Sequence, residues 1–211
     1  MTTSTLLWFI GSSAVFTLAP GPDTAFVLAQ GISRGRKAAI ITALGMCSGV
    51  SVHTTAAAFG ISAALYASAT AFAILKYAGA AYLLFLAYKA LKAHPSAPQQ
   101  PVAGIAAGAQ PWGAHFRRGF LMNVVNPKVS LFFLAFLPQF VTRDGGSFAL
   151  QMVLLGAVFM LQAIFVMSMI GYLSGSLGDT LSKKPLIARY LTWLTAGIFA
   201  ALGLRLALSQ R

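Results

Sequence analysis

Runs of apolar residues separated by short polar stretches form the main pattern of this sequence. An α-helix rises about 1.5 Å per residue, so roughly 20 apolar residues cross the hydrocarbon core of a bilayer. Six segments reach that length, at residues 6–31, 39–65, 71–91, 116–140, 148–173 and 188–208. The pattern therefore predicts an all-α, polytopic membrane protein of six transmembrane helices.

Two of these segments contain residues that interrupt a helix. Ala19-Pro20-Gly21-Pro22-Asp23 lies inside the first segment, and Asn126-Pro127-Lys128 lies inside the fourth. Proline lacks a backbone donor and fixes φ, whereas glycine opens backbone conformations that other residues avoid. We therefore predict that helices one and four are broken. In hydrocarbon, such breaks persist only where protein or a water-filled cavity satisfies the freed backbone groups.

Residues 94–113 divide the six helices into two sets of three. This stretch contains four prolines and several small residues, a composition typical of a flexible aqueous linker. We interpret residues 1–93 as a first three-helix repeat, residues 94–113 as a cytoplasmic linker and residues 114–211 as a second three-helix repeat, all within one membrane domain. With three spans in each half, equivalent helices cross in opposite directions, so the repeats have inverted topology.

The two breaks occupy matching positions of these halves. A shift of 105 residues places Pro22-Asp23 on Pro127-Lys128. Interrupted helices at equivalent positions are typical of a transport site near the bilayer midplane.

Basic residues indicate the orientation of the chain. The connections after spans one, three and five hold ten Lys and Arg residues, whereas the opposite side holds four. Cytoplasmic loops carry the excess of such residues, so both termini are predicted to be periplasmic. The N-terminal segment is interpreted as a retained span, because it lacks the basic region and the cleavage pattern of a secretion signal.

Composition agrees with a membrane location. Of the 211 residues, 58% are hydrophobic and 9% are charged, against roughly 25% charged in soluble domains. The net charge of +12 comes from basic residues between apolar runs, which favours cytoplasmic loops over nucleic-acid binding. The single cysteine, Cys47, cannot form an intrachain disulfide and is interpreted as a small packing residue. Gly45-x-x-x-Gly49 predicts a buried second helix that neighbours approach closely.

The breaks carry charges of opposite sign. Asp23 follows Pro22 at the start of a half-helix, where the helix dipole stabilises a carboxylate, and a carboxylate there could hold a cation. Asn126-Pro127 is typical of an N-cap followed by a first-turn proline, and the amides of the half-helix that follows suit an anion. Lys128 adds positive charge to that first turn, and Asn123 offers an amide one turn earlier.

A site with one cation-binding and one anion-binding part matches a zwitterion such as an α-amino acid. We therefore predict a substrate site at the midplane, between the two breaks. Its candidate residues are Pro20, Gly21, Pro22, Asp23, Asn123, Asn126, Pro127 and Lys128. The alternative is that Asp23 and Lys128 pair with each other and lock the two halves together. Both hypotheses hold if the substrate enters the pair.

His53 lies inside the second span and is a candidate for proton coupling, because histidine titrates near neutral pH. The alternative is that its neutral ring only hydrogen-bonds a neighbouring helix. The sequence has no H-E-x-x-H, no G-x-S-x-G and no second intramembrane aspartate. We therefore predict no catalytic residues, no metal site and no cofactor, which argues against an enzyme.

Several motifs resemble those of the LysE/RhtB family of bacterial amino-acid exporters, and the resemblance covers essentially the whole chain. They are the two breaks, Ser130-Leu131-Phe132-Phe133, Leu137-Pro138-Gln139-Phe140 and the stretch at 76–83. The resemblance implies a secondary transporter that exports amino acids or close derivatives across the cell inner membrane, driven by the proton gradient. Its implied partners are a small amino-acid substrate, protons and the lipid bilayer, and a homodimer is left open. A cadmium-type metal exporter and a small-solute channel of the same fold are the alternatives.

Overall fold

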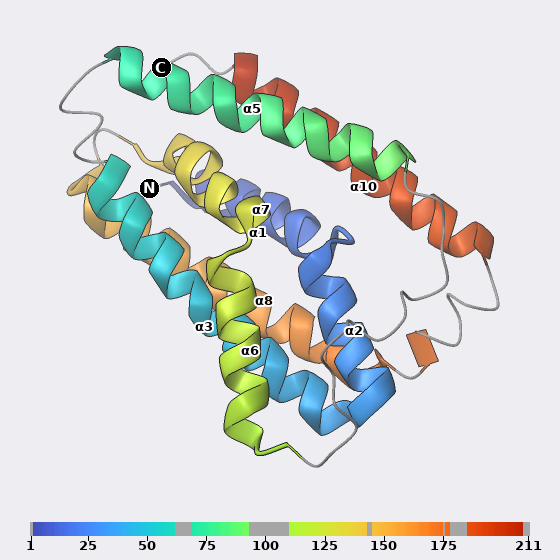
Figure 1. The fold of residues 1–211 in the computed structure, drawn as a ribbon. Helices are drawn as coiled ribbons and strands as arrows, with labels where there is room; N and C mark the ends of the chain where they lie inside the picture. The colour runs from blue at the N-terminus through green and yellow to red at the C-terminus, as the bar shows by residue number, and fades with distance from the viewer. Residues whose placement is uncertain are drawn as a thin grey trace.

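The computed structural model describes residues 2–61, 69–92, 110–142, 145–174, 176–177 and 185–208. Within these residues the regular structure is helical, without strands (Figure 1). The α-helices are α1 (Thr3–Leu18), α2 (Pro22–Arg34), α3 (Arg36–Ala56), α5 (Ala69–Lys92), α6 (Trp112–Val124), α7 (Pro127–Leu131), α8 (Phe148–Tyr172) and α10 (Pro185–Leu208). The π-helical segment η1 (Ala57–Ile61) extends α3, while η2 (Phe132–Phe136, π) and η3 (Leu137–Phe140, 3-10) extend α7. The all-α prediction is confirmed.

Several helices are long and apolar enough to cross a membrane. Three are straight, at Arg36–Gly60, Phe148–Tyr172 and Arg189–Leu208. Two bent pairs meet the same criterion, α1 with α2 at 55° and α6 with the α7–η3 segment at 49°, so the described residues hold up to five candidate spans. α5 coincides with the predicted span at 71–91, but some of its side chains lie outside the description, so its crossing stays a prediction.

The predicted linker falls largely outside the described residues. Residues 94–109 are not part of the description, and the helix α6 begins at Trp112. Residues 112 and 113, which the sequence pattern assigns to the linker, are therefore helical.

Both predicted breaks are present, and local chemistry explains each. α1 ends at Leu18, and α2 begins with Pro22 as its first residue after an extended Gly21. α7 begins with Pro127, and the Asn126 side chain accepts a hydrogen bond from the Lys128 backbone N–H at 3.0 Å. Proline in the first turn sacrifices no helical hydrogen bond, because that N–H has no intrahelical acceptor.

α3 lies at the centre of the bundle and packs against α2, α6 and α8. A Cβ atom added at Gly45 would collide with the backbone of Phe116 on α6, and one at Gly119 on α6 would collide with the backbone of Thr42. Small residues on both helices therefore let α6 lie directly on α3. This confirms the prediction of a closely approached second helix.

α5 and α10 pack side by side and form a two-helix layer along one flank of the bundle (Figure 1). The layer contacts the rest of the protein through η2, α7 and α1. Aromatic rings pack at the junction: the centroid of Phe16 on α1 is 6.2 Å from that of Phe199 on α10 and 4.1 Å from that of Phe132 on η2. The core is thus centred beside the two breaks.

The contact between α3 and α6 generates a test with a matched pair of glycines. Gly119→Ala should lower the free energy of unfolding by about 1–3 kcal/mol relative to Gly113→Ala, because the added methyl group overpacks the contact with α3. Gly113 lies on the same helix with nothing within 4 Å of an added Cβ. Alanine gains less helix propensity at Gly113, in the first turn of α6, than at Gly119 in its interior, so the difference in propensity opposes the predicted loss of stability. Thermal unfolding in detergent gives the comparison, and equal midpoints would contradict the close contact.

Candidate substrate site between the helix breaks

The two breaks meet at a buried ion pair. Lys128 Nζ lies 3.5 Å from Asp23 Oδ2, and the two side chains are 3% and 8% exposed. Lys128 Nζ also donates a hydrogen bond to the backbone carbonyl of Ala19 at 3.1 Å. Since Ala19 caps the C-terminus of α1, Lys128 satisfies one of the acceptors that the first break frees.

Two aromatic rings complete the environment of the Lys128 ammonium. Its Nζ lies 4.7 Å from the ring centroid of Phe16 and 5.7 Å from that of Phe199. Both distances suit a cation–π attraction, which strengthens when the cation is desolvated. The ammonium is thus held by a carboxylate, a carbonyl and two rings.

Gly21 is required here for space. Its backbone is extended, at φ −158°, so any residue could adopt that conformation. A Cβ atom on Gly21 would lie only 2.6 Å from Asp23 Oδ1 and 3.1 Å from Lys128 Nζ. A side chain at this position would therefore push the pair apart. Pro20, Pro22 and Pro127 are exposed, shape the backbone of the breaks and are not among the residues that line the cavity described below.

A cavity of about 20 Å³ adjoins Asp23, and the Lys128 side chain does not line it. That volume accommodates about one water molecule and is too small for an amino acid. It is lined by Phe16, Thr17, Asp23, Met46, Cys47, Val50, Asn123, Val129, Phe159, Ala163 and Met167. Most of these side chains are apolar, so the polar atoms are confined to a small part of the wall.

Two polar atoms of the lining have no partner. Asp23 Oδ1 and Asn123 Oδ1 are buried and accept no hydrogen bond from the described residues. Buried acceptors are nearly always satisfied in folded proteins, and an unsatisfied one carries a substantial free-energy penalty. These two oxygens are therefore candidate contacts for a donor that binds in the cavity.

His53 links the two sides of the second break. Its Nε2 lies 3.0 Å from the backbone carbonyl of Asn123, and its Nδ1 lies 3.4 Å from Ser130 Oγ. A carbonyl only accepts, so Nε2 carries the proton and Nδ1 of the neutral ring is an acceptor. Ser130 Oγ donates to the backbone carbonyl of Asn126. His53 is buried and makes the interhelical bond of the structural alternative, but it does not line the cavity.

The structure brings the predicted site residues Asp23, Asn123, Asn126 and Lys128 together, and it gives Asn126 a capping role. The side chain of Asn126 caps the amide of Lys128, so this amide, which the sequence pattern offers to an anion, is already occupied. Cys47 is buried among apolar side chains, as expected of a packing residue, and it also borders the cavity.

Sequence reasoning missed the rings that flank Lys128 and the apolar wall from α3 and α8. Phe199 belongs to α10, and nothing in its sequence surroundings distinguishes it from other apolar residues. Phe16 precedes Asp23 by seven residues. This spacing would predict a ring beside the ion pair only if the path of the chain through the break were known.

Broken helices around buried polar groups are typical of membrane transport proteins, and comparison with known proteins agrees. The LysE type translocator family matches residues 14–210, so the chain belongs to that family. It is a multi-pass membrane translocator, not an enzyme.

Three similar proteins cover between 64% and 97% of the chain. A leucine efflux protein of Enterobacter sp. (strain 638) is 28% identical, over 94% of this chain and 93% of its own. A membrane protein of Vibrio cholerae is 31% identical over 97% of both chains, and a leucine efflux protein of Salmonella typhimurium is 33% identical over 64% of this chain and 62% of its own. No solved structure matches.

The ion pair generates a test that separates its two interpretations. Asp23→Asn and Lys128→Met should each abolish transport and lower the free energy of unfolding by about 3–5 kcal/mol, because each leaves a buried charge without its partner. Thermal unfolding and uptake of labelled solute into vesicles measure both effects. Lys89→Met, which removes an exposed lysine of α5, is the control and should change neither.

The double variant Asp23→Asn with Lys128→Met decides between a lock and a binding site. For a purely structural lock, it should recover much of the stability and some transport. For a pair that contacts substrate, it should recover stability and stay inactive. Full transport by either single variant would contradict both interpretations.

Proposed function

We propose that this protein is a secondary transporter that exports an apolar α-amino acid from the cytoplasm across the bacterial inner membrane, driven by the proton gradient. The observation that carries the proposal is the ion pair beside an unsatisfied carboxylate oxygen and an apolar wall. The names of the leucine efflux relatives agree with it.

Each part of an amino acid has a counterpart in the site. The α-ammonium binds Asp23, whose Oδ1 lacks a donor. The α-carboxylate binds the Lys128 ammonium. An apolar side chain packs against Met46, Phe159 and Met167. A charged side chain would lie against this wall without a partner, at a large desolvation cost.

Binding requires the pair to open. At 3.5 Å, Asp23 and Lys128 leave no room for a substrate between them, and the adjoining cavity holds about one water molecule. The structure therefore corresponds to the unloaded carrier. Substrate enters when its ammonium group takes the place of Lys128 beside Asp23 and its carboxylate takes the place of Asp23 beside Lys128.

The arrangement of the helices supports a transporter of six spans in two inverted repeats, residues 1–93 and 114–211. The two breaks have similar bends of 55° and 49°. Sequence-equivalent helices also contact each other: α3 packs on α8, and α5 packs on α10. Contacts between equivalent elements are expected around a pseudo-twofold axis. The excess of basic residues supports a cytoplasmic connection after α2 and periplasmic termini.

The alternatives have less support. No group of three His, Cys, Asp or Glu side chains capable of holding a metal ion occurs in the described part of the chain, so nothing there favours metal export. A channel would dissipate a gradient, whereas a coupled carrier would build one. Whether the protein acts as a homodimer stays a prediction.

Substrate selection by the apolar wall is testable. In vesicles with an imposed proton gradient, the protein should accumulate labelled leucine and exclude lysine and glutamate. Ala163→Leu adds bulk to the α8 side of the cavity. It should lower leucine transport about tenfold relative to alanine transport, since a misplaced methylene group costs about 1–3 kcal/mol. Leu161→Phe, at an exposed position of the same helix, is the control. Equal loss for leucine and alanine would contradict the assigned wall, and leakage without accumulation would indicate a channel.

Proton coupling is assigned to His53. His53→Gln keeps a donor for the Asn123 carbonyl but cannot titrate near neutral pH, so it should reduce gradient-driven export while sparing exchange of labelled for unlabelled substrate. Paired measurements of export and exchange on the same vesicles separate these activities. If both fall equally, His53 serves packing or binding instead.

A further inference from the structure

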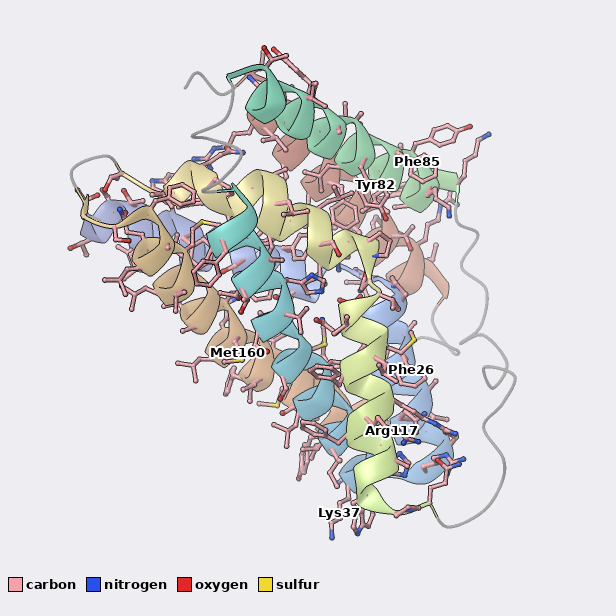
Figure 2. All side chains as sticks on the ribbon, turned by 60° about the vertical axis from the view of Figure 1, so that its left-hand side comes forward. Phe26, Lys37, Tyr82, Phe85, Arg117 and Met160 are labelled. Atoms are coloured by element: carbon pink, nitrogen blue, oxygen red, sulfur yellow. The ribbon has the colours of Figure 1, made fainter. Side chains whose placement is uncertain are left out.

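Two half-helices bring polar side chains from both halves of the chain to the cavity. Asp23 lies in the first turn of α2, and Asn123 lies in the last turn of α6. Both half-helices pack on α3, and Phe26 and Arg117 mark them in Figure 2. Asp23 and Asn123 both line the cavity, so a single ligand in it can contact both.

The other polar side chains of the lining leave these two residues unsatisfied. Asp23 Oδ1 and Asn123 Oδ1 have no hydrogen-bond partner in the described part of the chain. Thr17 Oγ1 donates to the backbone carbonyl of Ser13 at 2.8 Å, so its one proton is already used. The thiol of Cys47 is a weak donor and bonds neither oxygen. Two acceptors are therefore left for a donor from outside the protein.

A shared cavity distinguishes these oxygens from other orphan atoms. Gln30 and His115 also carry buried polar atoms that lack partners among the described residues, but neither side chain lines the cavity. Asp23 and Asn123 are 6% and 5% exposed, so bulk water does not compensate their oxygens. Such acceptors are rare in folded proteins, and here two of them face one space.

The size and charge of that space suit a primary ammonium group. The cavity of about 20 Å³ holds one group of the size of a water molecule, and an ammonium head group is about as large. A carboxylate oxygen beside an amide oxygen favours a cationic ligand with several donors, and an –NH₃⁺ group has three. Lys128 contacts Asp23 at Oδ2 and does not line the cavity, so Oδ1 stays available for a second ammonium.

The position of the Asn123 side chain is fixed by α3. A Cβ atom at Gly49 would lie 2.9 Å from both Cβ and Oδ1 of Asn123, so the amide occupies the space that this glycine leaves. The backbone carbonyl of Asn123 is bonded to His53 Nε2 at 3.0 Å. The oxygen is thus held in place before a ligand arrives, which lowers the entropy cost of binding.

We propose that Asn123 Oδ1 is the second acceptor for the α-ammonium group of the substrate, beside Asp23 Oδ1, and that the cavity selects primary amines over N-alkylated ones. This inference rests on the proposed function, to which it adds a specificity-determining residue and a substrate class. A methyl group on the nitrogen replaces one N–H donor. It also needs more room than a cavity of the size of one water molecule offers.

The first test needs only the unaltered protein. In vesicles with an imposed proton gradient, unlabelled leucine, N-methyl-leucine and 2-hydroxy-4-methylpentanoate compete with labelled leucine. N-methyl-leucine should compete about tenfold more weakly than leucine, because one extra methyl group in a confined pocket reduces recognition by about that factor. The hydroxy acid, which lacks the ammonium group, should not compete. Equal competition by leucine and N-methyl-leucine would overturn the inference.

A matched pair of variants assigns the selectivity to Asn123. Asn123→Ala removes the acceptor and enlarges the cavity, while the backbone carbonyl that His53 contacts is kept. It should raise the KM for leucine about tenfold, the usual effect of losing a hydrogen bond to a charged group, and weaken the preference for leucine over N-methyl-leucine. Gln30→Leu removes a buried amide outside the cavity and should change neither quantity. Unchanged values in folded Asn123→Ala protein would overturn the assignment.

Two further outcomes separate this inference from the proposed function. A requirement for Na⁺, together with equal recognition of leucine and N-methyl-leucine, would assign the cavity to a metal cation and overturn the ammonium site. Leucine transport without a preference for primary amines would contradict this inference alone. Absence of leucine transport by the unaltered protein would contradict the proposed function, and the inference with it.

Discussion

A charged side chain in the interior of a membrane protein is tolerated only beside a side chain of opposite charge. This constraint determines the arrangement at the centre of the molecule. Asp23 and Lys128 come within 3.5 Å of each other because the two polypeptide breaks meet in the interior of the bundle. The breaks in turn depend on the pair, since Lys128 satisfies the carbonyl that α1 leaves free at Ala19. Gly21 keeps the space between them clear. Each half of the chain thus supplies one charge and one helix break. Neither half could bury its charge without the opposite charge of the other half.

The same pair lets the proposed carrier change conformation both with substrate bound and without it. An α-amino acid carries the two charges of the site: its ammonium replaces Lys128 beside Asp23, and its carboxylate replaces Asp23 beside Lys128. The net charge of the site is therefore unchanged by binding. Since desolvation of unpaired charge is the large cost in hydrocarbon, loaded and empty forms face similar barriers. A substrate with a charged side chain would break this balance, in agreement with the apolar wall at the site.

Helices and breaks could be predicted because their causes are local. Apolar length, proline and glycine act within a few residues, so the predicted span at 148–173 differs from α8 by one residue, and the predicted span at 116–140 begins four residues after α6 does. The cavity wall could not be predicted. Apolar side chains face both the lipid and the core of a membrane protein, so the sequence does not distinguish buried Phe159 from exposed Leu161. Gln30 and His115 are visible as polar residues, but their burial depends on how each half-helix is rotated in the bundle.

Asn123 supplies a physical route between the proposed proton and substrate sites. Its backbone carbonyl is 3.0 Å from His53 Nε2, while its side-chain oxygen is buried without a partner at the cavity. α3 controls both contacts, because it carries His53 and also Gly49, whose missing side chain makes room for the Asn123 amide. Protonation of His53 at Nδ1 would turn an acceptor into a donor toward Ser130, whose hydroxyl donates to the N-cap carbonyl of Asn126 within α7. A proton on α3 would thereby act on the last turn of α6 and the first turn of α7 together. In the proposed cycle, α7 must move away from Asp23 when substrate enters the pair, because it carries Lys128.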